Sequence, residues 1–213
     1  MDVRLPTERV RVRRLPKRAA YDAASVAAVL DAGLVCHVGI VFDGAPLVIP
    51  MLYWRDADRL YLHGSQDSRL LRVVCSSEVC VTATHLDGIV LARSAFHHSV
   101  NYRSVTIVGR PQLVAEESEK ERALHAFVER VAPSRWPTLR PITAKELGLT
   151  KVVRMPLDEA SAKIRTGPPI DDPADLSWPC WAGVIPVGLA ISEPRAEPGV
   201  PADRAAPALS LGE

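Results

Sequence analysis

The chain has 213 residues, a formal net charge of +1 and a hydrophobic content of 47%. A chain of this length buries one good core with at most a small appendage, and its balanced charge gives no overall field that favours nucleic acid or a membrane surface. No run approaches the roughly 20 apolar residues that span a bilayer, and the N-terminus lacks the apolar region of a secretory signal. We therefore expect a cytoplasmic protein.

Three regions differ in composition. Residues 1–20 form a basic arm, which we interpret as a solvated segment lying over the domain or over a partner subunit; a nucleic-acid arm is the alternative. Residues 21–187 carry the hydrophobic patterns of a folded domain. Residues 188–213 are rich in proline and alanine without apolar periodicity, which predicts a disordered tail that is dispensable for folding.

The predicted elements are mostly short strands joined by turns. Asp22 can cap the first helix, and the Asp-Gly pairs at residues 43–44 and 87–88 predict turns between strands. Pro50 lies inside a strand, so it marks an edge, a bulge or a place where something other than a strand approaches. Strands are expected over 34–42, 46–54, 59–64, 78–86, 89–95, 97–114, 151–157 and 160–165, and helices over 22–31, 65–77, 116–131 and 143–148. This pattern predicts a closed antiparallel barrel with helices packed outside.

One strand end carries groups that suit an anion. The stretch YLHGSQDSRLLR places His63, Gly64, Ser65, Ser68 and Arg69 where a strand ends and a helix begins. Amides at the start of a helix, together with serine and arginine side chains, fit a phosphate-sized ligand. The alternative is ordinary helix capping by Ser65 or Asp67, with Arg69 in solvent.

A second stretch, HHSVNYRSVTIVGRP, begins a strand with four polar residues in a row. Asn101 and Arg103 share one face of the strand, and Tyr102 and Ser104 share the other. Buried polar groups need partners. A polar ligand, a neighbouring subunit or an interstrand hydrogen-bond network would each supply them.

Metal and hydrolase motifs are absent. The four cysteines (Cys36, Cys75, Cys80 and Cys180) form no CxxC pair and are interpreted as buried free thiols, and the six histidines match no metal-binding pattern. We therefore expect no metal site. His63 and His85, each at a strand end, are expected to line a pocket. No GxSxG, P-loop or GxGxxG motif is present.

Taken together and in this order, these stretches resemble the pyridoxamine 5'-phosphate oxidase-like, FMN-binding split-barrel proteins, and within them the nitroimidazole-resistance (Nim)-like branch. The resemblance covers roughly residues 8–187 and rests on AVLDAGLVCHVGI, PLVIPMLYWR, LYLHGSQDSRLLR, VTATHLDGIVLARSAFHHSVNYRSVTIVGRP, EASAKIRTGPPIDD and, after a gap, WAGVIP. The family's oxidases have Ser-Arg-Lys where this chain has Ser68, Arg69 and Leu70. Their substrate-phosphate residues near the C-terminus have no clear match.

The resemblance implies a mainly β fold, a six-stranded antiparallel split β-barrel with peripheral helices. It also implies a homodimer with two FMN sites at the subunit interface. The strand segment Val48, Ile49, Pro50 and Met51 would run beside the isoalloxazine ring, and the turn from His63 to Arg69 would hold the ribityl phosphate. Asn101, Tyr102, Arg103 and Ser104 would then lie against the flavin or against the interface that encloses it.

The function expected from this resemblance is an FMN-dependent oxidoreductase that reduces or oxidises a small organic molecule. His63 and Tyr102 are the candidate catalytic residues, as polar groups beside the ring. We expect neither nucleic acid nor membrane as a partner. The alternatives are a non-catalytic protein that binds or senses flavin, or haem through a histidine, and a deazaflavin-dependent reductase of the same fold.

Overall fold

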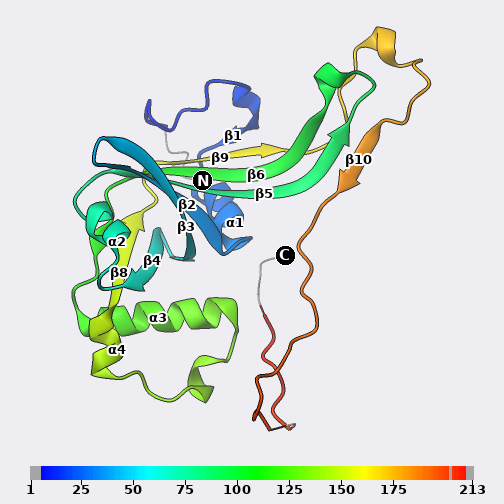
Figure 1. Ribbon diagram of the computed structural model, residues 1–213. Helices are drawn as coiled ribbons and strands as arrows, with labels where there is room; N and C mark the ends of the chain where they lie inside the picture. The colour runs from blue at the N-terminus through cyan, green and yellow to red at the C-terminus, as the bar shows by residue number, and fades with distance from the viewer. Residues whose placement is uncertain (1–5, 202, 210–213) are drawn as a thin grey trace.

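The computed structural model describes residues 6–201 and 203–209 as an antiparallel sheet with helices on its outside (Figure 1). The strands are β1 (Ala19–Ala20), β2 (Val35–Phe42), β3 (Ala45–Asp56), β4 (Arg59–Ser65), β5 (Val79–Leu91), β6 (Ser99–Gly109), β7 (Gln112–Leu113), β8 (Thr150–Pro156), β9 (Ala160–Arg165) and β10 (Gly183–Pro186). The helices are α1 (Ala23–Asp31), α2 (Arg69–Val74), α3 (Glu117–Val131) and α4 (Ala144–Leu149), with short 3-10 turns η1 (Pro16–Arg18), η2 (Ala95–His97), η3 (Trp136–Thr138) and η4 (Pro173–Asp175).

The sheet curls back on itself. Its strand order is β1-β9-β6-β5-β2-β3-β4-β8-β7, with β10 paired to β5. β8 and β9 therefore lie near opposite ends of the sheet, yet the chain from Pro156 to Ala160 spans at most about 14 Å. The two ends must come close together. A mainly antiparallel β fold is thus confirmed, although the sheet has ten strands and no pairing between described strands joins its ends.

Two apolar cores lie on opposite faces of β3 and β4. The main core fills the inside of the curled sheet and includes Val38, Tyr53 and Ile107, with Leu30 of α1 packed among them. The Tyr53 hydroxyl donates a hydrogen bond to the Leu30 carbonyl at 2.6 Å, which fixes α1 against β3. The second core lies between α3 and the other face of these strands; it comprises Trp54, Tyr61, Val114, Ala123, Leu124, Leu147 and Val152.

Much of the sheet's outer face is uncovered. We use "outer face" for the side of β2, β3, β5 and β6 that points away from the main core. Because side chains alternate along a strand, the outward residues of β2 and β3 are those at odd and even positions respectively. They include Val35, Val41, Val48 and Leu52, which are 50%, 67%, 62% and 44% exposed. The residues that the structure describes leave these apolar side chains largely exposed.

The second Asp-Gly pair does not form the expected turn. β5 runs unbroken from Val79 to Leu91, with a register shift against β6 between Leu86 and Gly88. The Asp87 carboxylate accepts hydrogen bonds from the Arg103 guanidinium on β6. A Cβ on Gly88 would come within 2.9 Å of Val184 of β10, so the glycine serves close packing between strands. A bulge therefore replaces the turn.

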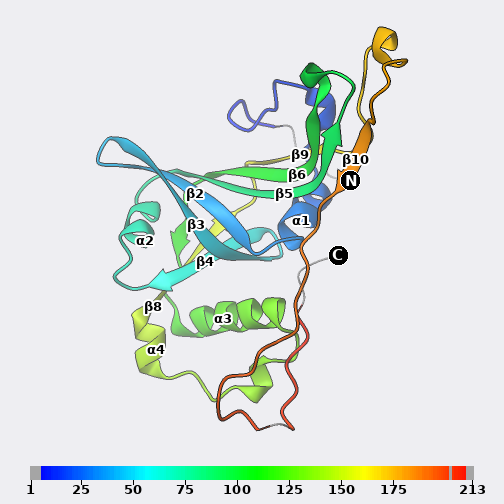
Figure 2. The same cartoon turned by 45° about the vertical axis from the view of Figure 1, so that its right-hand side comes forward.

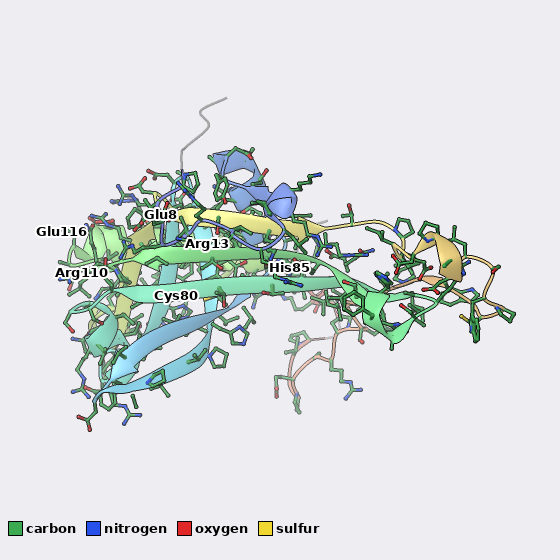
Figure 3. The ribbon with its side chains drawn as sticks, turned by 90° about the horizontal axis from the view of Figure 1, so that it is seen from above. Glu8, Arg13, Cys80, His85, Arg110 and Glu116 are labelled. Atoms are coloured by element: carbon green, nitrogen blue, oxygen red, sulfur yellow. The ribbon has the colours of Figure 1, made fainter. Side chains whose placement is uncertain are left out.

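The segment before the sheet contacts the folded domain, whereas the described segment after it is exposed. Near the N-terminus, Arg9 bridges Glu78 and Glu159, and Val10 is buried at 4% exposure. Figure 3 shows this segment, with Glu8 and Arg13 labelled, beside β9. Residues 188–201 and 203–209 have neither helix nor strand and are exposed throughout. Residues 1–5, 202 and 210–213, at the outer parts of the arm and tail, lie outside the described residues.

Two further expectations can be compared with the structure. The cysteines are free, but only Cys36 is buried; Cys180 is exposed because its segment projects from the body, so that expectation was wrong for Cys180. Within residues 6–201 and 203–209, no helix is long and apolar enough to cross a membrane.

Candidate functional site

One edge of β3 is free. The hairpin between β2 and β3 turns at Asp43 and Gly44, with φ of 51° and 75°, which is the pattern of a type I′ turn. In such a hairpin the pairs alternate between hydrogen-bonded and non-hydrogen-bonded, starting from the bonded pair Phe42–Ala45. Pro50 falls in a non-bonded pair with His37, so its nitrogen points to the opposite edge.

Among the residues that the structure describes, no strand pairs with that opposite edge over the first part of β3. β4 pairs with β3 only from Tyr53 to Asp56. The Val48 amide and the Val48 and Pro50 carbonyls therefore face away from β2 at an open edge, which agrees with the expectation that Pro50 marks an edge. Backbone groups of this kind can pair with a ligand that carries amide-like donors and acceptors.

The residues Val48 to Met51 divide between two faces. Val48 and Pro50 are exposed on the outer face, whereas Ile49 and Met51 pack partly against the main core. Only the first two side chains, together with the strand edge, are available to a ligand in the single chain.

The turn between β4 and α2 lies next to this edge. The Ser68 hydroxyl accepts a hydrogen bond from the Leu71 amide, and the Ser65 hydroxyl accepts one from the Asp67 amide. Ser68 is thus the residue that caps α2, whereas the alternative to phosphate binding expected Ser65 or Asp67 to cap it. The exposed Arg69 guanidinium lies 4.7 Å from the centre of the Phe42 ring, so it joins the start of α2 to the tip of the β2–β3 hairpin.

Two neighbours of Arg69 explain the shape of this turn. Leu70, at the position of the oxidases' lysine, is 7% exposed and belongs to the main core. A Cβ on Gly64 would lie 3.0 Å from Leu71, so α2 packs closely against β4. Arg69 is consequently the charged side chain that this turn offers to an anion.

His63 lies in an aromatic setting. Its ring is 5.7 Å from the Trp54 ring and 4.8 Å from the Phe127 ring of α3, and its Nδ1 is buried without a hydrogen-bond partner. Burial lowers the pKa of His63 because the charged imidazolium loses its hydration. The imidazole is therefore neutral at neutral pH, which makes it a poor proton donor in the single chain.

The polar residues that begin β6 have partners within the chain. Arg103 is paired with Asp87. The Asn101 amide donates to the Gly167 carbonyl and accepts a hydrogen bond from Arg165. The Ser104 hydroxyl donates to the backbone carbonyl of residue 163. An interstrand network thus satisfies three of the four residues, and the half-buried Tyr102 remains on the outer face.

The two candidate catalytic residues are not brought together in one chain. His63 lies on β4 and Tyr102 on β6, and three strands (β5, β2 and β3) stand between them in the sheet. His85, which we expected to line a pocket, instead fills the space between β5 and α1. Its Nε2 lies 2.9 Å from the Val29 carbonyl, and its ring occupies the space that a side chain on Gly33 would need. Gly33, which the sequence indicates only as the end of the first helix, was the available signal.

Sequence reasoning also missed an extension of the sheet. Beyond the bulge at Asp87, β10 pairs with β5 through Gly183–Leu91, Val184–Val90, Ile185–Ile89 and Pro186–Gly88. We call the ends of β5, β6 and β10 the hairpin extension; Figure 2 shows that it projects from the body of the sheet. The β-branched pair Val184 and Ile185, which lies between Trp181 and Pro186, was the signal that could have revealed this strand.

Comparisons with known proteins agree with this geometry. The family model described as pyridoxamine 5'-phosphate oxidase matches residues 22–164. The flavocytochrome Anf3 from Azotobacter vinelandii is 41% identical, with 96% of this chain and 95% of that chain covered and a TM-score of 0.91. The FAD and heme binding protein from Mycobacterium smegmatis is 33% identical, with 89% and 94% covered and a TM-score of 0.85.

A more distant structure shares the fold alone. It is described as a 5-nitroimidazole antibiotic resistance protein from Bacteroides thetaiotaomicron, and it is 22% identical, with 68% of this chain and 86% of that chain covered and a TM-score of 0.58. No curated protein matches the chain. The match of the family model over residues 22–164, together with two relatives above 30% identity, confirms the resemblance found in the sequence. The chain therefore belongs to the pyridoxamine 5'-phosphate oxidase family.

Proposed function

We propose that the chain is a flavin- and haem-binding protein that transfers electrons between the two groups and a small organic molecule. The observation that carries this proposal is the similarity to a flavocytochrome, at 41% identity over 96% of the chain. The M. smegmatis relative, which is named for FAD and heme, supports the same pair of cofactors.

The flavin site that the geometry supports best is the open edge of β3 with the adjoining α2 turn. The ring would lie against Val48 and Pro50, where the free amide and carbonyls can meet the donors and acceptors along its edge. Arg69 is the charged group nearest the end of the hairpin, and it suits the phosphate that follows the ribityl chain. When bound, the flavin supplies one- and two-electron transfer.

FMN and FAD share this ribityl phosphate, so the site is compatible with both. The sequence predicts FMN, whereas the M. smegmatis relative is named for FAD. Arg69 would contact the shared phosphate in either case, and the adenosine half of FAD would extend beyond the described turn.

A homodimer would complete the site. His63 and Tyr102 are separated by three strands within one chain, and the outer face between them is apolar and uncovered. A second copy packed on this face would bring its Tyr102 toward the flavin of the first and enclose the ring. The six-stranded split barrel of the family remains part of this proposal, supported by the short connection from Pro156 of β8 to Ala160 of β9.

Within such a site the protein's own side chains have limited acid–base capacity. His63 is neutral and buried against Trp54 and Phe127, so it would act as a hydrogen-bonding or packing group. The Tyr102 hydroxyl, on the outer face, is the remaining candidate proton donor. An electron-transfer role with little proton chemistry fits these groups better than a hydrolytic or group-transfer role.

The test is the cofactor content of the purified protein. Denaturation followed by chromatography and mass spectrometry identifies FMN, FAD or a deazaflavin, and a pyridine haemochrome assay counts haem. We expect one flavin per chain together with haem. If neither flavin nor haem is retained, and neither binds on reconstitution, the proposal is wrong; flavin without haem would limit the function to that of a simple flavoprotein.

A further inference from the structure

The hairpin extension presents an apolar face. Val100 on β6 pairs with Ile89 on β5, which pairs with Ile185 on β10, so the three side chains form a row on one face. Val100 is 37% exposed and Ile185 is 49% exposed. Beside this row, the Trp181 ring lies over Gly183, where any Cβ would come within 2.9 Å of it. A flat apolar ligand would find a matching surface here.

His98 lies at the end of this face. It precedes Val100 by two residues and lies just before β6 begins, and its φ of −58° and ψ of 142° are close to polyproline II values. The residue is exposed, and the neighbouring Phe96 is 89% exposed. An imidazole thus stands at the border of an uncovered apolar and aromatic surface.

The hydrogen bonding of His98 defines its tautomer. Its Nδ1 lies 2.8 Å from the Ser94 carbonyl oxygen. A carbonyl oxygen can only accept, so Nδ1 carries the proton, and the lone pair of the neutral ring is on Nε2. Among the described residues, no hydrogen bond or ion pair engages Nε2. Histidines that bind a metal are held in this way, with the second ring nitrogen donating to a carbonyl or carboxylate.

The other five histidines lack this arrangement. In His85 and His97, it is Nε2 that lies against a protein oxygen, at 2.9 Å from Val29 and 3.3 Å from Asp172. His63 has a buried Nδ1 without a partner. The His125 ring lies 4.9 Å from the Trp136 ring and is tilted by 50° against it, and no hydrogen bond among the described residues orients His37 or His125. His98 is the histidine whose Nε2 is both oriented and free.

Two unsatisfied polar atoms lie in the same turn. Arg93 Nε and Ser94 Oγ are buried and have no hydrogen-bond partner. Arg93 is otherwise paired with Asp171 through its NH1 group. Both atoms are shielded from solvent, so an external carboxylate could reach this turn only through the part of the Arg93 side chain that is exposed, which is 26% of it. The propionates of haem are carboxylates on an otherwise apolar, planar ring.

We propose that His98 is the axial ligand of the haem, and that the haem lies on the apolar face of the hairpin extension with a propionate toward the Arg93–Ser94 turn. The inference rests on the proposed function, because the haem itself is suggested by the named relatives. Beyond that function, the inference names the residue that binds the iron, the surface on which the haem lies and the turn that a propionate faces.

The experiment is a haemin titration of haem-free protein, followed by the Soret band and by the iron–histidine stretch in resonance Raman spectra of the reduced form. Wild type is compared with His98→Ala, with His98→Asn, and with the matched controls His97→Ala and His37→Ala. In His98→Asn the side-chain amide lies near the position of the histidine Nδ1, so it can still donate to the Ser94 carbonyl while the ligand is lost. Circular dichroism and flavin content are measured for each variant.

Loss of a group that only orients a metal ligand weakens metal binding by roughly 10- to 100-fold, and we expect both His98 variants to weaken haemin binding by more than this. The iron–histidine stretch should vanish, and added imidazole should restore a ligated spectrum in His98→Ala. The two control variants should match wild type.

The outcomes separate the inference from the function on which it rests. If wild type binds flavin but no haem, the haem part of the proposed function fails, and the inference fails with it. If wild type binds haem with an iron–histidine stretch that persists in both His98 variants, the proposed function stands and His98 is not the ligand. A loss confined to His97→Ala or His37→Ala would likewise assign the ligand elsewhere.

Discussion

Arg69 is a residue with two competing roles. Its guanidinium lies over the Phe42 ring, a contact that contributes about 0.5–1 kcal/mol at an exposed site. A charge-assisted contact to phosphate contributes about 1.5–3 kcal/mol, so the phosphate role would dominate if the flavin binds here. The neighbouring Leu70 cannot share this role because it is buried in the core.

Replacing Arg69 with alanine should therefore weaken FMN binding by roughly 10- to 100-fold, because each 1.4 kcal/mol corresponds to about a factor of ten in affinity. Riboflavin, which lacks the phosphate, should lose much less. Flavin-fluorescence titrations of both ligands measure the difference, and Arg72→Ala, an exposed arginine one turn later, is the control. Equal losses for FMN and riboflavin in Arg69→Ala would remove Arg69 from the phosphate site.

His63, which packs beside the second core, makes the free energy of unfolding depend on pH. Burial lowers its pKa below the ordinary value of about 6.5, so the folded state takes up a proton only at lower pH than the unfolded state does. Above about pH 6.5 the imidazole is neutral in both the folded and the unfolded chain, so it does not change the stability. Below that pH the unfolded chain binds a proton more readily than the folded chain does, and the free energy of unfolding therefore decreases as the pH falls.

Exchange of His63 for phenylalanine should flatten this dependence. Urea unfolding at pH 7.5 and pH 5.5 should show a smaller loss of stability for His63→Phe than for wild type, because no imidazole remains to be protonated in the unfolded chain. His37→Gln, which changes an exposed histidine, should retain the wild-type difference. An identical pH response in wild type and His63→Phe would contradict the role of burial.

At the scale of helices and strands, the sequence predicted correctly those caps and turns that depend only on neighbouring residues. Asp22 caps α1, as expected, by accepting a hydrogen bond from the Ser25 amide. The Asp-Gly pair at residues 43–44 forms its turn, whereas the same dipeptide at residues 87–88 becomes a bulge. The difference lies in Arg103 and β10, which are distant in sequence and hold Asp87 and Gly88 within a continuous strand.

The candidate site was less accessible to sequence reasoning for the same reason. The pattern around Ser68 and Arg69 indicated a polar turn, but it could not decide between capping and ligand binding. The free edge of β3 depends on how far β4 extends, and the partners of Asn101 and Arg103 lie in other parts of the chain. Only the assembled sheet determines which of these backbone and side-chain groups already have hydrogen-bond partners and which remain available to a ligand.

Two glycines provide a matched test of the packing between elements. A Cβ on Gly64 would meet Leu71 at 3.0 Å, whereas Gly148, in α4, has nothing within 4 Å. Gly64→Ala should therefore push α2 away from β4 and lower the free energy of unfolding by about 1–3 kcal/mol. Gly148→Ala should raise it by about 0.5–1 kcal/mol, because alanine favours the helix.

Denaturant unfolding measures both changes in otherwise identical chains. A neutral effect of Gly64→Ala would mean that Leu71 can move aside without cost, and the close packing of α2 would then have no energetic consequence. A destabilising Gly148→Ala would contradict the helical environment found for α4.

At the scale of the whole molecule, the uncovered outer face should bind a second copy of the chain. Sedimentation at micromolar concentration should give a mass of about twice the 23.2 kDa of one chain. Leu52→Glu, on the outer face, should shift the protein toward the monomer, because a carboxylate would lose its hydration in the interface. The control Leu149→Glu changes an exposed leucine at the end of α4 and should leave the mass unchanged. A monomeric wild type with flavin bound would disprove the two-chain site.

The pairing of β1 with β9, which are far apart in the sequence, also has a consequence for synthesis on the ribosome. Ala19 of β1 pairs with Lys163 of β9, about 140 residues later, and the free edge of β5 waits for β10, which is made later still. At translation rates of about 5–20 residues per second, the first strand waits on the order of 7–30 s for its partner. The nascent protein therefore carries unpaired strand edges for much of its synthesis, and the sheet is completed only after nearly the whole chain has emerged.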